Sequence, residues 1–180
     1  MGRALVIVDI QKDYFPGGAH PLVAPEAAAT AARRVLDAFR ASGDPVVHVR
    51  HVWDEEDATF MRPETDGVEI HSAVAPAEGE LVITKEFPNS FRETALEDEL
   101  RRRGVESLVV CGMMTSMCVD ATVRAAVDLG FDTTVVHDAC ATCDLEFDGR
   151  SVPAPQVHSA FLAALADGYA TIVSSDEIAG

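Results

Sequence analysis

Three residues of different chemistry lie at or just beyond the ends of short apolar segments: Asp9, Lys85 and Cys118. The apolar runs before Asp9 and Lys85 are typical of buried strands, and a third such run precedes Cys118 by a few residues. Asp9 could simply cap the turn after its strand, and a single lysine is most often a solvated surface charge. Together, however, the carboxylate can take the thiol proton, the ammonium can stabilise the resulting anions, and the cysteine can attack a substrate. The sequence predicts a nucleophilic site if these strand ends are neighbours.

The cysteine belongs to the segment LVVCGMMTSMCVDATVRAAVDLG, residues 108–130. A short buried strand over 108–111 is followed by a glycine and by two residues that commonly cap helices. A stripe of small residues then predicts a helix over about 117–129 that packs closely against a sheet. We therefore expect Cys118 in the first turn of a helix, where unpaired N–H groups and the helix dipole favour a thiolate.

Expected strands and helices alternate along the whole chain, which predicts an α/β fold. Right-handed crossovers would give a six-stranded, mainly parallel sheet with helices on both faces, a three-layer sandwich. A chain of 180 residues is near the size of one domain, so we expect a single domain over 1–180. The long polar segment 54–80 is expected to be a lid or an interface arm. The expected strands cover 4–10, 45–53, 81–84, 107–111, 133–137 and 169–173, and the expected helices cover 25–41, 93–103, 117–129 and 154–167.

The chain is strongly acidic, with 30 acidic against 14 basic residues and a formal net charge of −16 at pH 7. Such a charge repels phosphate backbones and anionic lipids, so we expect neither nucleic acid nor a membrane as a partner. No apolar run reaches the roughly 18 residues needed to span a bilayer. The apolar run near the N-terminus lacks a signal-peptide cleavage pattern, and we therefore expect a cytoplasmic protein.

The cysteines and histidines offer further ligand types. Cys140 and Cys143 form the motif CATC, and free thiols are expected in a chain without a secretory signal. The spacing leaves a redox pair or half of a zinc site as an alternative, and whether CATC closes a disulfide stays open. His48 and His51 on the second strand could bind a metal, but a polar residue on a strand is more often structural. The sequence assigns no role to His71, His137 and His158.

Three stretches, VDIQKDYF, ITKEFPNSF and VVCGMMTSMCVDATVRAA, resemble the isochorismatase-like cysteine hydrolases, which include nicotinamidases and N-carbamoylsarcosine amidohydrolase. The last stretch is the most specific, and the resemblance covers nearly the whole chain. It implies a catalytic triad of Asp9, Lys85 and Cys118, a cis peptide bond between Met113 and Met114, and an oxyanion hole formed by the N–H groups of Met114 and Cys118. The implied reaction is hydrolysis of a C–N bond in a small amide, carbamoyl or lactam substrate, through a thioester on Cys118 and without a cofactor.

The chain departs from the nicotinamidases where these carry a metal-binding Asp-x-His, because it reads HVWD at residues 51–54. We therefore predict no metal, which also argues against nicotinamide as the substrate. A cysteine nucleophile likewise argues against the vinyl-ether cleavage of the isochorismatases. Each aromatic candidate for the substrate pocket could equally be core. The predicted substrate-binding residues are Gln11, Phe15, Trp53, Asn89, Phe91 and Met117.

Two other functions are compatible with parts of the sequence. A non-catalytic member of the same fold could bind a small molecule or sense oxidants through Cys118, although an intact Asp9 and Lys85 argue against it. A nucleotide-binding domain would need a glycine-rich GxGxxG loop after the first strand, and this chain has none there. The resemblance also implies a homo-oligomer, with the segment 54–80 as a possible contact between subunits.

Overall fold

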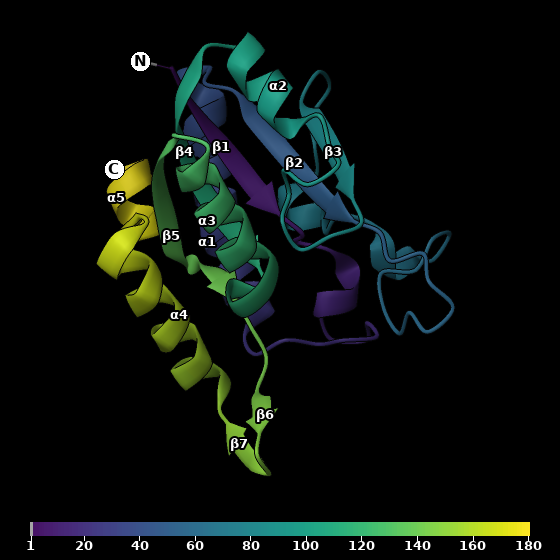
Figure 1. The fold of residues 1–180 in the computed structure, drawn as a ribbon. Coiled ribbons are helices and arrows are strands. Elements are labelled where there is room, and N and C mark those ends of the chain that lie inside the picture. Colours follow the sequence, from purple (N-terminus) through teal and green to yellow (C-terminus); the bar gives the residue numbers. More distant parts are fainter. Residues whose placement is uncertain (1) are drawn as a thin grey trace.

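The computed structural model describes residues 2–180 and shows a six-stranded parallel sheet between two layers of helices (Figure 1). Met1, the first residue of the predicted domain, lies outside the described part. The strands of this sheet are β1 (Gly2–Val8), β2 (Val46–His51), β3 (Leu81–Lys85), β4 (Val105–Met113), β5 (Asp132–Ala141) and β8 (Thr171–Val173). They lie in the order β3-β2-β1-β4-β5-β8, and every neighbouring pair is parallel. The predicted fold class is confirmed.

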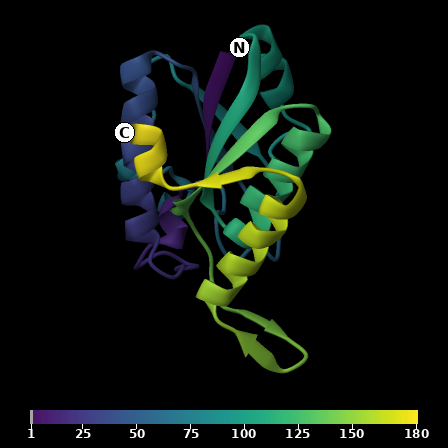
Figure 2. The ribbon, with the colours of Figure 1, turned by 90° about the vertical axis from the view of Figure 1, so that its left-hand side faces the viewer.

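Helices cover both faces of the sheet (Figure 2). The helices are α1 (Pro25–Ser42), α2 (Leu96–Arg102), α3 (Asp120–Asp128), α4 (Ala154–Gly168) and α5 (Ser175–Ala179). α1 and α5 pack together on one face, whereas α2, α3 and α4 lie on the other (Figures 1 and 2). Within residues 2–180, no helix has the length and apolar character needed to cross a membrane.

The two central strands bring the site together. β1 is GRALVIV, and its last five residues are buried because sheet neighbours and helices enclose it on all sides. It pairs with β2 on one side and with β4 on the other, so that Val8 lies opposite both Val49 and Gly112. Because the strands are parallel, their carboxyl ends meet at one edge of the sheet, where ligand sites of such folds lie.

Several elements differ from the sequence prediction. β5 extends to Ala141, beyond the predicted end at 137, because a bulge shifts its register against β4. α2 begins three residues later than predicted. A small antiparallel hairpin, β6 (Leu145–Phe147) and β7 (Arg150–Val152), projects from the body and was not predicted (Figure 2). The C-terminal helix α5 was also missed, since five residues are too few to give a periodic signal.

The long segment 54–80 is held against the loop that follows β1. It contains two short 3₁₀ turns, Asp66–Val68 and Ser72–Val74. The N–H of Lys12 donates to the carbonyl of Glu69 at 3.0 Å, and the N–H of His71 donates to the carbonyl of Ile10 at 2.8 Å. The segment therefore forms a wall beside the carboxyl edge of the sheet.

A glycine permits the close approach of β1 and β4 next to Asp9. Gly112 has a φ of +139°, and a Cβ at this position would lie 2.0 Å from the carbonyl oxygen of Val8. We expect Gly112→Ala to lower the free energy of unfolding by about 3 kcal/mol or more, because backbone strain and overpacking add. Gly130→Ala is the matched control, with a φ of +87° and open space around it, and should cost about 1–2 kcal/mol. Urea unfolding of both variants measures the difference, and equal losses would contradict the steric argument.

Candidate active site

The three predicted catalytic residues lie together at the carboxyl edge of the sheet. Asp9 follows β1, Lys85 ends β3 and Cys118 lies in the turn between β4 and α3. The Nζ atom of Lys85 lies 2.6 Å from Asp9 Oδ2 and 3.4 Å from Cys118 Sγ. All three are almost fully buried, with exposed fractions of 0%, 2% and 4% for Asp9, Lys85 and Cys118. The structure thus places the ammonium of Lys85 in contact with both the carboxylate of Asp9 and the thiol of Cys118.

Asp9 has an unusual backbone for a non-glycine residue, with a φ of 49°. Its N–H donates to Val49 at 3.0 Å, and its carbonyl accepts from Gln11 at 2.9 Å, which fixes the turn just beyond β1. Left-handed backbone costs about 1 kcal/mol or more for such a residue, and costs of this kind concentrate at functional sites. Among residues 2–180, no donor makes a well-directed hydrogen bond to either carboxylate oxygen. Apart from its ion pair with Lys85, the carboxylate is therefore free to accept a proton.

Cys118 lies in a single π-helical turn, Thr115–Val119, that precedes α3. The N–H groups of Met117 and Val119 both donate to the carbonyl of Met114, at 3.1 and 3.2 Å. Such π turns are rare and often occur at functional sites. The peptide bond between Met113 and Met114 is cis, at the position that the resemblance implied.

The protonation state of Cys118 differs from the sequence expectation. The position of the thiol at the start of a helix predicted a thiolate. Burial, together with the negative charge of Asp9, instead raises the pKa of the Cys118 thiol well above its usual range, and Lys85 offsets this only in part. The raised pKa favours the protonated thiol near pH 7, and such a thiol can act as a nucleophile only after a base removes its proton. Burial lowers the pKa of the Lys85 ammonium, but Asp9 and Cys118 together raise it by more, so Lys85 stays charged.

His51, the last residue of β2, is a member of the site that the sequence analysis did not assign. Asp9, His51 and Cys118 form a cluster of metal-ligating types whose ligand atoms lie within 4.8 Å of one another. Lys85 Nζ contacts all three, including His51 Nδ1 at 2.9 Å. The ammonium thus supplies positive charge at the centre of this cluster. Burial and then Lys85 lower the pKa of His51 to about 4, so the ring is neutral near pH 7.

Tyr14 is a second residue that the prediction missed. It follows Asp9 in the loop after β1, is 2% exposed, and packs beside Phe60 with 5.9 Å between ring centroids. Burial, followed by the negative charge that Cys118 carries when it is a thiolate and by that of Asp9, raises the pKa of its phenol well above the usual range. The phenol is therefore a neutral group close to the thiol.

The predicted substrate-binding residues divide into two groups. The Gln11 amide is fully used by backbone, because Nε2 donates to the carbonyls of His51 and Val68 and Oε1 accepts from the N–H of His51. Asn89 Oδ1 accepts from the N–H of Phe91, a local turn contact. The Phe91 ring stacks on Phe131, which precedes β5 at the opposite end of the sheet, with centroids 6.0 Å apart. Gln11 and Phe91 are thus engaged within the fold, and we do not retain them as substrate ligands, whereas a single turn contact through Oδ1 leaves Asn89 a candidate.

The other three candidates remain near the carboxyl edge. Phe15 stacks on His71 with ring centroids 3.8 Å apart, beside a polar cavity of about 410 Å³. Trp53 meets Phe60 edge-on at 5.4 Å. Met117 directly precedes the cysteine and is 47% exposed. Phe15, Trp53 and Met117 therefore stay candidates for the walls of the substrate pocket.

The remaining histidines and cysteines make contacts of their own. His48 is buried and its Nε2 lies 2.8 Å from Glu80, and His71 Nδ1 accepts from the N–H of Ala73. All four cysteines are free thiols in the structure. Cys140 donates to the carbonyl of Val136, whereas Cys143 contacts the sulfur of Met114 at 3.8 Å. The CATC motif therefore forms no disulfide here.

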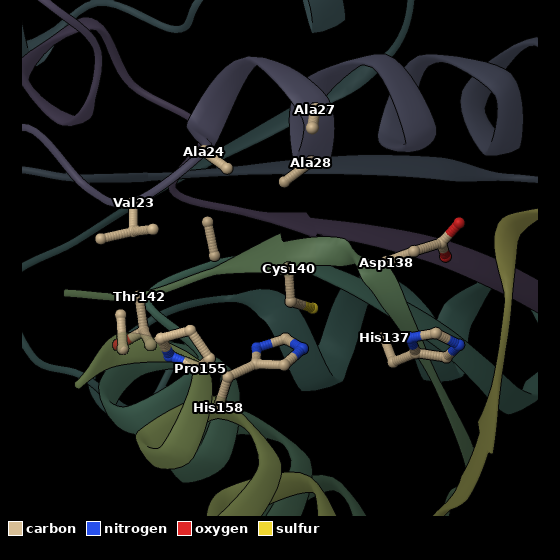
Figure 3. Close-up of a pocket in the computed structure, with 12 residues that line it drawn as sticks. Val23, Ala24, Ala27, Ala28, His137, Asp138, Cys140, Thr142, Pro155 and His158 are labelled. Atoms are coloured by element: carbon tan, nitrogen blue, oxygen red, sulfur yellow. The ribbon is translucent and has the colours of Figure 1, made fainter. Parts of the chain in front are cut away.

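A second cavity, of about 210 Å³, lies between α1, β5 and α4 (Figure 3). Its lining includes His137, Asp138, Cys140 and His158, and none of the three predicted catalytic residues. His158 Nδ1 also lies 2.9 Å from Oγ1 of Thr115, the first residue of the π turn that holds Cys118. This cavity is thus separate from the cluster around Lys85, but its lining contacts the π turn through His158 and also through Thr142, whose Oγ1 lies 2.8 Å from Ser116 Oγ.

Comparison with known proteins places the chain in a family. Residues 3–177 match the family model described as "Isochorismatase domain". The chain is 51% identical, over 98% of both chains, to the uncharacterized isochorismatase family protein YddQ of Bacillus subtilis. It is 34% identical to the maleamate amidohydrolase of Pseudomonas putida, over 75% of this chain and 70% of that protein.

Solved structures agree with this assignment. The putative isochorismatase hydrolase of Oleispira antarctica superposes with a TM-score of 0.95 at 50% identity, over 99% of this chain and 97% of that one. N-carbamoylsarcosine amidase from Thermoplasma acidophilum superposes with a TM-score of 0.81 at 30% identity, over the full length of both. The resemblance seen in the sequence is confirmed: the chain belongs to the isochorismatase family and is a hydrolase of that family.

Proposed function

We propose that this hydrolase cleaves a C–N bond of a small amide, carbamoyl or lactam substrate through a thioester on Cys118. One observation carries the proposal: the buried ammonium of Lys85 contacts both the carboxylate of Asp9 and the thiol of Cys118. A general base, a cation and a nucleophile in this order are the parts that covalent acyl transfer needs.

In the first half of the reaction, Asp9 takes the proton of Cys118 as the sulfur forms a bond to the substrate carbonyl carbon. Lys85 stabilises the negative charge that passes from the carboxylate to the sulfur. The carbonyl electrons move onto oxygen, and the N–H groups of Met114 and Cys118 are our candidates to bind that oxyanion. When the C–N bond breaks, Asp9 returns its proton to the departing nitrogen, and a thioester remains on Cys118.

In the second half, water releases the acyl group. Asp9 takes a proton from water, the hydroxide oxygen attacks the thioester carbon, and the C–S bond breaks. The proton then returns from Asp9 to the sulfur, which restores the resting site. The protonated resting thiol fits this cycle, because the thiolate forms only when a substrate is present to receive it.

The relatives support the same class of reaction. The maleamate amidohydrolase and the N-carbamoylsarcosine amidase are both named for action on a C–N bond. The burial of Cys118, with Phe15 and Trp53 as candidate walls of the substrate pocket, suits a small substrate rather than a polymer.

Intact-mass spectrometry tests the proposal directly. The wild-type protein is mixed in turn with small amides, N-carbamoyl compounds and lactams, quenched in acid, and assayed in parallel for ammonia or amine release. We expect one compound class to release ammonia or amine and to leave an acyl adduct that peptide mapping assigns to Cys118. If no compound reacts while dilute peroxide adds oxygen at Cys118 alone, the proposed C–N bond hydrolysis through a Cys118 thioester is overturned in favour of thiol sensing.

A further inference from the structure

We propose that His51 is a positioning residue of this site: its Nδ1 accepts the third N–H of the Lys85 ammonium and so holds that group between Asp9 and Cys118. This inference rests on the proposed function, since it concerns how the same three residues are aligned. It assigns a role to a side chain that lies within the cluster but outside the predicted triad.

The count of donors and acceptors around Lys85 carries the inference. An ammonium group has three N–H donors and no acceptor. Lys85 Nζ has three acceptors in reach: Asp9 Oδ2 at 2.6 Å, His51 Nδ1 at 2.9 Å and Cys118 Sγ at 3.4 Å. Lysine is otherwise a flexible point charge on a four-carbon stem. With His51 in place, the ammonium is held by two hydrogen bonds, to His51 and Cys118, and by the ion pair with Asp9, so that its rotation away from Asp9 or Cys118 would break a buried contact.

The backbone around His51 is built to hold the ring there. His51 ends β2 and lies opposite Lys85 in the register of β2 and β3. Its N–H donates to Gln11 Oε1 and its carbonyl accepts from Gln11 Nε2, both at 2.8 Å. Gln11, two residues after Asp9, thus ties the end of β2 to the loop that carries the general base. These two hydrogen bonds fix His51 and Asp9 relative to one another.

The contact also fixes the form of the imidazole. Nδ1 can accept from an ammonium only when it carries no proton, so the neutral ring holds its proton on Nε2. The groups that face the ring are the charged side chains of Lys85 and Asp9 and the neutral thiol of Cys118. The lowered pKa of His51 agrees with a ring that stays neutral beside Lys85.

Two substitutions of His51 distinguish the effect of losing its hydrogen-bond acceptor from the effect of losing its packing. His51→Leu keeps a similar volume and removes the acceptor, whereas His51→Asn places an amide oxygen near the position of Nδ1. We expect His51→Leu to lower kcat about 10- to 100-fold, with KM changed less than about threefold, because the loss falls on the reacting groups. His51→Asn should recover most of that loss. His137→Leu and His137→Asn, at a histidine of the separate cavity, should leave kcat unchanged.

A second readout works even without turnover. The rate at which iodoacetamide alkylates Cys118, followed by intact mass across pH, reports how well Lys85 stabilises the thiolate. We expect the midpoint of this profile to move to higher pH in His51→Leu and to stay near that of the wild type in His51→Asn. Wild-type kcat and alkylation in His51→Leu, or a folded His51→Asn as impaired as His51→Leu, would overturn the positioning role. If Cys118→Ala retains turnover, the proposed function itself fails, whereas the alkylation profiles still decide the role of His51.

Discussion

Replacing Cys118 with Ala is expected to abolish hydrolysis, with a loss of at least about 10⁴-fold in kcat/KM. The sulfur is the only group of the site that can form the acyl bond in our mechanism, and neither Asp9 nor Lys85 can replace it. The fold should survive, because alanine fits a small, buried position in the π turn and the thermal midpoint should move by no more than about 4 °C. Ammonia release and acid-quenched intact mass, measured with the substrate that the panel identifies, check both parts.

A matched cysteine makes this test specific. Cys140→Ala removes another buried thiol, which donates to the carbonyl of Val136 and lines the separate cavity. That variant should keep wild-type turnover and its acyl adduct. Turnover by Cys118→Ala at more than a few per cent of the wild-type rate would contradict a thioester mechanism, as would an adduct that maps to another cysteine.

The catalytic candidates could be predicted from the sequence because each lies at or just beyond the end of an apolar run. A buried run of branched residues is a good signal for a strand, and parallel strands place their carboxyl ends at one edge. This reasoning was enough for Asp9 and Lys85. For Cys118 it gave the position beyond a strand but the wrong charge state, because burial by the rest of the fold outweighs the local effect of the helix start.

His51 was missed because its role depends on the order of the strands. The sequence analysis made the site conditional on the ends of the first, third and fourth strands lying near one another, and it did not place the second strand, which lies between β1 and β3. The end of β2 is therefore next to both Asp9 and Lys85. The predicted second strand ran on to residue 53, so the strand-end criterion pointed to Trp53 and Asp54 and not to His51, where β2 ends.

Side-chain directions in loops could not be predicted either. Gln11 and Phe91 both follow strand ends, as pocket residues do, yet Gln11 turns to the backbone of β2 and Phe91 reaches Phe131 at the far end of the sheet. These directions follow from the path of each loop over the core, which residue types and spacing do not specify. The bulge in β5 and the β6–β7 hairpin could not be predicted for the same reason, because residue types and spacing do not specify them.

The buried ion pair of Asp9 and Lys85 leads to the other large expected effect. Lys85→Met keeps an unbranched side chain of similar length but leaves the fully buried carboxylate of Asp9 without its cation. Breaking a buried pair from one side costs about 3–5 kcal/mol of unfolding free energy, because the remaining charge is uncompensated. We expect that loss in urea unfolding, together with loss of turnover.

The double variant distinguishes charge compensation from packing. In Asp9→Asn with Lys85→Met both charges are gone, so most of the lost stability should return, whereas turnover should stay absent because base and cation are both missing. The exposed pair of Arg33 and Asp37 on α1 is the control, and Arg33→Met should leave the unfolding free energy nearly unchanged. If the two substitutions at the site were additive in stability, the ion pair would contribute nothing beyond packing. Such a result would remove the physical reason for a charged Lys85 beside the nucleophile. An ammonium whose electrostatic attraction to Asp9 at 2.6 Å adds no stability could not stabilise a thiolate at 3.4 Å.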